Sequence, residues 1–346
     1  MIRRPVLRRS LMAAGIAAAF AVGAATLAPA PATAADPMRV RIAWSTTPTE
    51  MMPILFEKKE ILKHYGKSYI AEPIRVRGSG PQVTAMAAGE LEIGALAPNT
   101  FTLAIQNAKL DDLKVVADSG RDGHEDHFSS EYVVRPDSPI KSVADLKGKV
   151  IATNGIGGAT DMGLRKLLRD AGLDDKRDLK IVEVEFPNML AALTEKRIDM
   201  ASMALPFAYE AKKNKQVRVL ARMKDSMGAN EKNFLVIRGS FIEANRPALV
   251  DLFEDMLIAT RWFLDPKNRD EALAIIANYN KAPVSNFSEW VFTKEDNYHP
   301  VDMVPDLDML QRNIETLVGL GYLKSAVDVR KHSDLSLLQE AAARLN

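Results

Sequence analysis

The sequence predicts an α/β protein of two lobes, each built on a mixed, mostly parallel sheet with helices on both faces. Short apolar runs rich in valine and isoleucine alternate with amphipathic helical patterns, an order typical of parallel sheets. A weak internal repeat also indicates two lobes, because residues 85–98 and 192–205 share a helix end, a surface turn and a buried apolar run. Ligands of such sheets bind beyond the carboxyl ends of the strands, so two facing lobes predict a cleft.

The apolar runs place the elements along the chain. Strands are predicted over 38–44, 74–77, 113–117, 149–153, 180–184 and 198–204. Helices are predicted over 53–65, 101–107, 189–193, 249–263, 269–277 and 306–320. Residues 131–135 are expected to cross into the second lobe and 234–237 to cross back.

A glycine-rich segment, Asn154-Gly-Ile-Gly-Gly-Ala-Thr160, follows the predicted strand over 149–153. Its glycines let backbone N–H groups approach a ligand closely. A helix beginning near Thr160 would direct unpaired N–H groups and its positive dipole end at the same place. The segment therefore predicts a seat for an anion. A glycine-rich turn without a ligand is the alternative.

Composition excludes several classes of protein. The chain of 346 residues has no cysteine, which excludes disulfides, a lipid-anchor cysteine and a thiol nucleophile. Removing residues 1–34 takes away four arginines and no acid, so the formal charge falls from +1 to −3. That balance argues against a nucleic-acid partner, which needs a dense basic surface.

The N-terminus has the pattern of an export signal. Four arginines within residues 3–9 precede an Ala-rich apolar run over 11–27, and Ala32-Thr-Ala34 offers a cleavage site before Ala35. A membrane span is the alternative, but the run is only weakly apolar and lacks a basic downstream flank. The pair Arg8-Arg9 permits the twin-arginine route as well as the general secretory route. We expect a periplasmic protein cleaved near Ala34.

No catalytic motif is evident. The chain lacks a nucleophile elbow, a phosphate-loop lysine motif and a His-Glu-x-x-His helix. His124-Glu-Asp-His127 gathers four metal-ligand side chains, but the spacing matches no specific metal motif, and a solvated loop is the favoured interpretation. We expect no cofactor, no metal site and no enzymatic activity.

Three segments carry a resemblance to a known family. Asp137-Ser-Pro-Ile-Lys-Ser-Val-Ala-Asp-Leu-Lys-Gly-Lys-Val-Ile-Ala, Ala88-Gly-Glu-Leu-Glu-Ile-Gly and Gly319-Leu-Gly-Tyr-Leu resemble motifs of periplasmic substrate-binding proteins of ABC importers. The similar group binds sulfonates, taurine, nitrate and thiamine precursors. One departure is Lys196, where the family usually carries glycine.

The resemblance implies a type II periplasmic-binding-protein fold with a C-terminal helical cover. The implied domain order is a signal peptide over 1–34, the first lobe over 35–129, the second lobe over 130–231 and the rest of the first lobe over 232–346. It also implies a monomer that works with an importer permease and its ATPase.

Strand ends, helix starts and the glycine-rich segment supply the candidate ligand contacts. They are Trp44, Ser45, Thr46, Thr47, Arg77, Ser79, Gly80, Asn99, Thr100, Gly155, Gly157, Gly158, Ala159, Thr160, Asn188, Pro206 and Phe207. Trp44 can equally be a core residue, and Asn188 can be a simple helix cap. Arg77 and Arg121 could supply charge, although arginines are more often paired or solvated at the surface.

Hydroxyl and N–H donors dominate this set, and they favour a small organic anion. A sulfonate such as taurine or an alkanesulfonate is the first choice. An aromatic carboxylate of the phthalate type is the alternative, because Trp44 and Phe207 could flank a ring. The alternative from another class, an enzyme like the thiamine-pyrimidine synthases, has a family pattern with cysteines that this chain lacks. A transcription regulator's effector lobe would need a helix-turn-helix where the signal lies.

Overall fold

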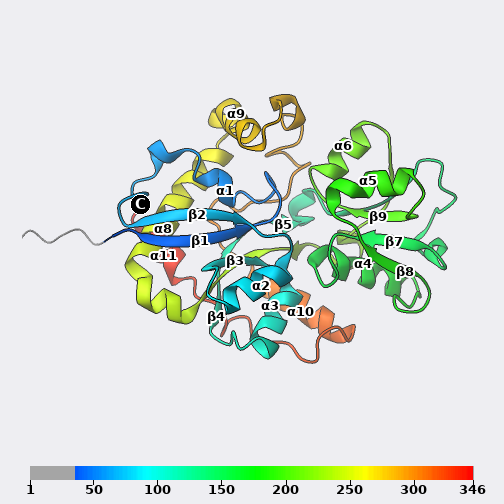
Figure 1. Ribbon diagram of the computed structural model, residues 1–346, viewed down its shortest axis with the longest axis horizontal. Coiled ribbons are helices and arrows are strands. Elements are labelled where there is room, and N and C mark those ends of the chain that lie inside the picture. The colour runs from blue at the N-terminus through cyan, green and yellow to red at the C-terminus, as the bar shows by residue number, and fades with distance from the viewer. Residues whose placement is uncertain (1–35, 346) are drawn as a thin grey trace, which may run out of the picture. The chain divides into compact units, whose positions relative to one another are not determined.

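Two five-stranded mixed sheets organise residues 36–345, the part of the chain that the computed structural model describes (Figure 1). These residues belong to one compact unit that begins at Asp36. The predicted signal peptide and its cleavage site lie outside the described residues. Among the described helices, none combines the length and the apolar character needed to cross a membrane.

The first sheet has the strand order β2-β1-β3-β12-β4. Its strands are β1 (Met38–Trp44), β2 (Tyr69–Arg75), β3 (Ile93–Leu96), β4 (Leu113–Asp118) and β12 (Phe234–Arg238). Strand β1 pairs in parallel with β2 and β3, whereas β12 runs antiparallel between β3 and β4. Side chains of β12 alternate between two cores: Leu235 packs into one and Val236 into the other.

The second sheet repeats this plan with the order β10-β6-β9-β7-β8. Its strands are β6 (Glu131–Val134), β7 (Val150–Thr153), β8 (Lys180–Glu183), β9 (Met200–Met203) and β10 (Arg218–Arg222). Strand β7 is parallel to β8 and β9, and the antiparallel β6 lies between β9 and β10. The predicted mixed and mostly parallel sheets are therefore confirmed.

Helices cover both faces of each sheet, as predicted. One core on the first sheet includes α2 (Ser79–Ala87), α3 (Pro98–Asn107) and α10 (Leu307–Gly319). The opposite face packs against α1 (Met52–Leu55), α8 (Gly239–Leu264), α9 (Arg269–Asn280) and α11 (Ser336–Ala343). On the second sheet, α4 (Ala159–Asp170) and α7 (Lys224–Met227) cover one face, and α5 (Phe186–Thr194) and α6 (Phe207–Lys213) cover the other.

The chain passes between the sheets along β5 (Arg121–Asp122) and β11 (Asn230–Glu231), which pair antiparallel. Arg121 is buried there, with its Nε atom 3.0 Å from a carboxylate oxygen of Asp118 and 3.0 Å from one of Glu231. Its second nitrogen donates to the carbonyl of Val304 at 2.6 Å. Arg121 therefore joins the two connecting segments and is absent from the lining of the cleft described below.

Two predicted elements are wrong in part. The expected helix over 53–65 is α1 followed by a single 3₁₀ turn at Lys59–Ile61. Helix α1 ends at Leu55, and further along the chain the Asp255 carboxylate accepts the backbone N–H groups of 63–65, which a helix over 53–65 would satisfy internally. The strand expected over 74–77 is β2, which runs from Tyr69 to Arg75 because the residues of β1 from Met38 to Trp44 pair with it along this whole length.

Candidate functional site

A cleft lies at the carboxyl ends of parallel strands from both sheets. Its cavity has a volume of about 540 Å³. The first sheet lines it with residues that follow β1, β2 and β3, and the second with residues that follow β7, β8 and β9. Open α/β sheets bind ligands at this position because strand-end loops and helix N-termini meet there.

Most of the candidate contacts line this cleft. They are Ser45, Thr46, Arg77, Ser79, Gly80, Asn99, Thr100, Gly155, Gly157, Gly158 and Phe207. Ala159 and Thr160 line a smaller inner cavity that adjoins the cleft. The remaining four, Trp44, Thr47, Asn188 and Pro206, line neither cavity.

Two of these four join β1 to α9. The Trp44 ring packs edge-on against Tyr279, with ring centroids 6.0 Å apart. The hydroxyl of Thr47 donates to the side-chain oxygen of Asn280 at 2.5 Å. Both side chains therefore face the first-sheet helices, which is the core alternative that the sequence left open for Trp44.

The other two are displaced by the local course of the chain. Helix α5 begins at Phe186, with Pro187 in its first turn, so Asn188 is an exposed residue inside the helix. Its backbone N–H donates to the carbonyl of Glu185. Pro206 precedes α6, and its neighbour Leu205 lines the inner cavity in its place.

Backbone N–H groups of the glycine-rich segment already donate to acceptors within the protein. The N–H of Ile156 donates to the Glu183 carboxylate at 2.7 Å, and the N–H of Gly157 donates to the Asp161 carboxylate at 2.9 Å. The N–H of Gly158 donates to a backbone carbonyl. Two negative side chains thus hold the N–H groups that an anion would need, so this loop is a poor anion seat.

The inner cavity is small and polar. Its volume is about 70 Å³, and it shares Ser45, Thr46, Gly78, Asn154 and Phe186 with the cleft. Beyond Ala159 and Thr160, the polar side chains that line it are Thr49, Glu50, Gln82, Lys232 and Asn233. Burial raises the pKa of Glu50 to about 7, although its carboxylate accepts the N–H of Ser45 at 2.8 Å.

Sequence reasoning missed several charged residues of the site. Arg75, Glu183 and Glu185 line the cleft. Glu185 follows a predicted strand, so the rule that found Ser79 could have found it. Arg75 and Glu183 lie inside predicted strands and are the last residues of β2 and β8. Lys232 and Glu50 carried no such signal, because only the tertiary fold brings the segment before β12 and the start of α1 to the inner cavity.

Charges on the cleft walls are partly neutralised across it. Arg77, which follows β2, makes an ion pair with Glu185, which precedes α5. Their side chains are 60% and 51% exposed, so the pair contributes little to stability. The amide of Asn99 donates to the carbonyl of Gly157, a second contact between the first-sheet and second-sheet walls.

The cleft also has an apolar wall. Phe186 and Phe207 stack with ring centroids 6.1 Å apart and an interplanar angle of 20°. Ile156 is 59% exposed and Leu103 is 39% exposed, although both are apolar. Exposed apolar side chains around a cleft are typical of ligand-binding sites, so the geometry suits a ligand with an apolar part.

Among the described residues, the His124–His127 loop does not bring three ligand atoms close together. Tyr298 packs between the two histidine rings, with centroids 4.6 Å from His124 and 5.3 Å from His127. His127 also lies within 3.2 Å of the carbonyl of Asp296. These contacts give the rings a structural role.

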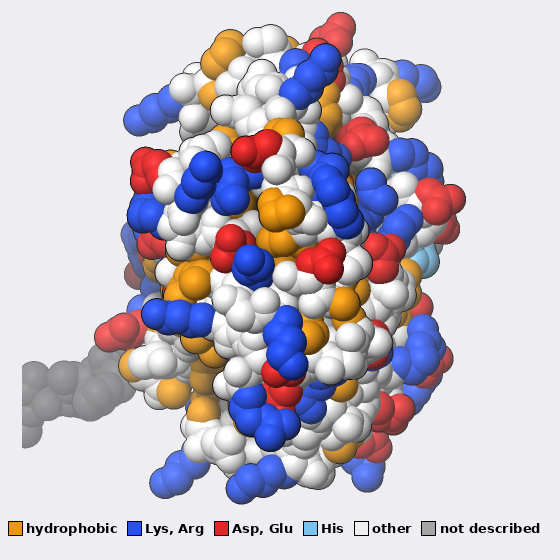
Figure 2. Space-filling model, turned by 90° about the vertical axis from the view of Figure 1, so that its right-hand side faces the viewer, with side chains coloured by type: hydrophobic (Ala, Val, Ile, Leu, Met, Phe, Trp, Pro, Cys, Tyr) orange, Lys and Arg blue, Asp and Glu red, His pale blue; other side chains and the backbone are white. Residues whose placement is uncertain are grey.

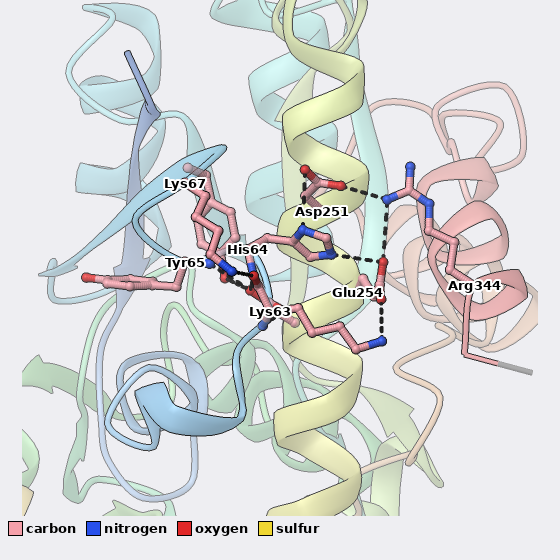
Figure 3. Close-up of polar contacts among 9 residues, drawn as sticks. Lys63, His64, Tyr65, Lys67, Asp251, Glu254 and Arg344 are labelled. Atoms are coloured by element: carbon pink, nitrogen blue, oxygen red, sulfur yellow. Dashed lines mark hydrogen bonds and ion pairs between the residues drawn. The ribbon is translucent and has the colours of Figure 1, made fainter. Parts of the chain in front are cut away.

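A different group, His64, Asp251 and Glu254, has ligand atoms within 4.8 Å of one another (Figure 3). Lys63 lies 2.8 Å from a Glu254 oxygen, and Arg344 lies 2.6 Å from an Asp251 oxygen. The two cations balance the two carboxylates, so little negative charge is left to attract a metal ion. The cluster instead ties α8 to the segment before β2 and to the C-terminal helix.

Surface charge is mixed on the face shown in Figure 2. Lys and Arg side chains lie beside Asp and Glu over this face, and neither sign forms a continuous area. A nucleic-acid footprint requires a clustered basic surface. This face offers none.

The model of the NMT1-like family matches residues 33–277. The chain belongs to the NMT1-like family. A relative of this NMT1-like protein from Brachyspira hyodysenteriae, whose name describes an ABC transporter periplasmic binding protein, is 33% identical over 155 residues. That alignment covers 40% of this chain and 42% of the relative. The nitrate/nitrite binding protein NrtA of Synechococcus elongatus is 27% identical over 43% of this chain and 35% of its own. The chain therefore spans less than half the length of these curated relatives.

Solved structures show the same fold. The periplasmic aliphatic sulphonate binding protein SsuA from Escherichia coli superposes with a TM-score of 0.64 and 19% identity, over 86% of this chain and 92% of that one. The periplasmic nitrate-binding protein NrtA from Synechocystis PCC 6803 superposes with a TM-score of 0.70 and 14% identity, over 90% of this chain and 89% of that one. The desulfurization enzyme DSZB superposes with a TM-score of 0.61 and 15% identity, over 89% of this chain and 100% of that one. At such identities these likenesses establish the periplasmic-binding-protein fold, which an enzyme shares.

Proposed function

We propose that this protein is the periplasmic solute-binding component of an ABC importer and captures a small organic anion in the cleft. The observation that carries the proposal is the cleft itself, lined by six parallel strand ends from two sheets. A ligand there contacts both walls, so binding favours the closed arrangement by its differential affinity. A permease and its ATPase would receive the ligand, and the chain would act as an exported monomer.

Hydrogen-bond donors support a sulfonate, such as taurine or an alkanesulfonate, as the ligand. Ser45, Thr46 and Thr100 supply hydroxyls to the cleft, and SsuA, a sulphonate binder by name, has the same fold. The stacked pair Phe186 and Phe207 favours a second candidate, an aromatic carboxylate of the phthalate type, because a ring can pack against them.

An enzyme on this fold is the class alternative. DSZB carries the fold, so the fold by itself leaves catalysis open. The chain has no cysteine, and thiol chemistry is therefore excluded. We expect the purified protein to release its ligand chemically unchanged.

A thermal-shift screen tests the proposal. Sulfonates, aromatic acids, nitrate and pyrimidine precursors are compared with neutral and cationic compounds of similar size. A ligand that binds only the native state raises the melting temperature, so at least one organic anion should do so. Mass spectrometry of the recovered ligand checks for turnover. A response to neutral or cationic compounds alone would contradict the anion proposal, and a converted ligand would contradict the binding role.

A further inference from the structure

We propose that the inner cavity is the acid-group subsite and that Lys232 is the cation that holds the acid group. This inference rests on the proposed function. It assigns the ligand's single carboxylate or sulfonate to the inner cavity and its apolar part to the cleft. It moves the anion seat from the N–H groups of residues 156–158, which already have acceptors, to the helix start at Ala159 and Thr160.

Lys232 has the position and the chemistry for this role. It lies between β11 and β12, where the chain returns to the first sheet, and it lines the inner cavity beside Asn233. Glu50 and Asp296 interact with its ammonium group only through longer-range electrostatics, without a hydrogen bond or an ion pair. Within 36–345 the ammonium group has no direct carboxylate partner, so an acid group from a ligand can pair with it.

The other cations of the site are already engaged. Arg77 pairs with Glu185. Arg75 donates to the carbonyl of Ser45 at 3.3 Å and lies over the Trp44 ring, 5.5 Å from its centroid. An anion at either arginine would displace an existing contact, whereas an anion at Lys232 displaces none among the described residues.

Backbone donors complete the subsite. Helix α4 begins at Ala159, and the N–H groups of Ala159 and Thr160 donate to no acceptor among the described residues. Both residues line the same cavity as Lys232. The cavity, about 70 Å³, has room for one acid group but no second cation to hold another. The subsite therefore favours a monoanion whose body extends past Phe186 into the cleft.

The acids facing Lys232 predict how binding depends on pH. Glu50, two residues before α1, lines the same cavity as Lys232, and Asp296, in the segment after α9, interacts with Lys232 and Arg269 electrostatically. Burial raises the pKa of each acid to about 7. Above that pH both are ionised and weaken the positive potential at Lys232, and below it they are neutral. Anion affinity should therefore rise as the pH falls from 8 to 6.

Calorimetric titration of residues 36–346 with butane-1-sulfonate, benzoate and inorganic sulfate tests the inference. Lys232→Met removes the charge and keeps the length of the side chain, and Lys232→Arg restores a charge. Loss of a charged hydrogen bond should weaken binding of the better organic probe about 10- to 100-fold in Lys232→Met. Lys232→Arg should recover part of that loss. Lys147→Met, at a 71% exposed side chain, is the matched control and should bind as the wild type does.

The outcomes separate this inference from the proposed function. If the wild type binds none of the three anions, both fail. If the wild type binds and Lys232→Met binds equally well with a flat pH profile, the subsite assignment alone is overturned. Arg77→Met losing more affinity than Lys232→Met would move the acid group to the outer cleft. Circular dichroism on each variant shows whether a loss of binding reflects unfolding.

Discussion

At the residue scale, backbone conformation separates the two copies of the internal repeat. In the first copy α2 ends and Gly89 follows with φ of 71°; in the second α5 ends and Lys196 follows with φ of 60°. Both turns close with the same bond, from Glu90 N–H to the Ala85 carbonyl at 2.8 Å and from Arg197 N–H to the Ala192 carbonyl at 2.9 Å. The second copy has Lys196 at the position of Gly89, and this lysine adopts a positive φ that is strained for a residue with a Cβ atom.

Replacing that lysine should stabilise the fold. We expect Lys196→Gly to raise the free energy of unfolding by about 1 kcal/mol, because glycine adopts positive φ without the Cβ clash. Urea unfolding measures the change. The mirror variant Gly89→Lys should lower stability by a similar amount. Variants that shift stability in the same direction would contradict the strain argument.

Glu50 predicts how stability depends on pH. Its pKa is about 7 in the folded chain and near its ordinary value of 4.5 in the unfolded chain, so the folded state binds the extra proton between these values. Stability contributed by this group is therefore lost as the pH rises through that window. Removing the titration with Glu50→Gln should make the variant gain on the wild type by about 1–3 kcal/mol between pH 5 and pH 8.

Urea unfolding at both values measures that gain, with Asp145→Asn as the control. Backbone N–H groups of Lys141 and Ser142 lower the pKa of Asp145, so this carboxylate is ionised at both pH values. Its stabilising contribution is lost only as the pH falls below its ordinary range. Asp145→Asn should consequently cost the same stability at pH 5 and at pH 8. An equal effect of Glu50→Gln at both values would show that the carboxyl is not buried.

At the element scale, α8 holds the segment before β2 by one buried acid. Asp255 accepts the backbone N–H groups of Lys63, His64 and Tyr65 at 2.7, 2.9 and 3.1 Å. It also accepts the hydroxyl of Tyr69 at 2.8 Å. These four bonds fix the segment that leads into β2, which begins at Tyr69. The neighbouring Asp251, one turn earlier on α8, pairs instead with Arg344 near the surface (Figure 3).

The two aspartates should differ in their effect on stability. Asp255→Asn places an amide donor against N–H groups, and we expect a loss of about 2–4 kcal/mol in the free energy of unfolding. Asp251→Asn weakens an ion pair with Arg344, whose side chain is 44% exposed, and a longer contact of 3.7 Å with His64, so the expected loss is at most about 1 kcal/mol. Urea unfolding of the two variants measures both. Equal losses would show that the Asp255 contacts are solvated.

At the scale of the whole molecule, the cleft walls touch through only a few polar contacts. Arg77 with Glu185 and Asn99 with Gly157 connect residues after first-sheet strands to residues of the second-sheet wall. The exposed Arg77–Glu185 ion pair is worth at most about 1 kcal/mol. The Asn99–Gly157 bond is a single neutral hydrogen bond from a buried side chain, worth about 0.5–1.5 kcal/mol. Ligand contacts can therefore outweigh them and shift the population between open and closed arrangements.

Small-angle scattering tests this closure. A saturating ligand from the thermal-shift screen should reduce the radius of gyration, because closure brings the two walls together. A compound that leaves the melting temperature unchanged is the control and should leave the radius unchanged. An unaltered radius with a bound ligand would mean that the walls are already closed in the free protein, and the closure mechanism would then be wrong.

The sequence by itself determined the alternation of strands and helices, the mixed sheets, the repeat and the strand ends that line the cleft. These follow from local periodicity and from the rule that parallel strands end at one edge. Only the tertiary structure decided where charge lies in the site. The carboxylates of Glu183 and Asp161 accept backbone N–H groups of the glycine-rich segment. Trp44 packs against Tyr279. Lys232 reaches the inner cavity from the crossover. Apart from Asp161, which lies four residues after Gly157, each of these outcomes depends on a partner far away in the sequence, and no local pattern records such partners.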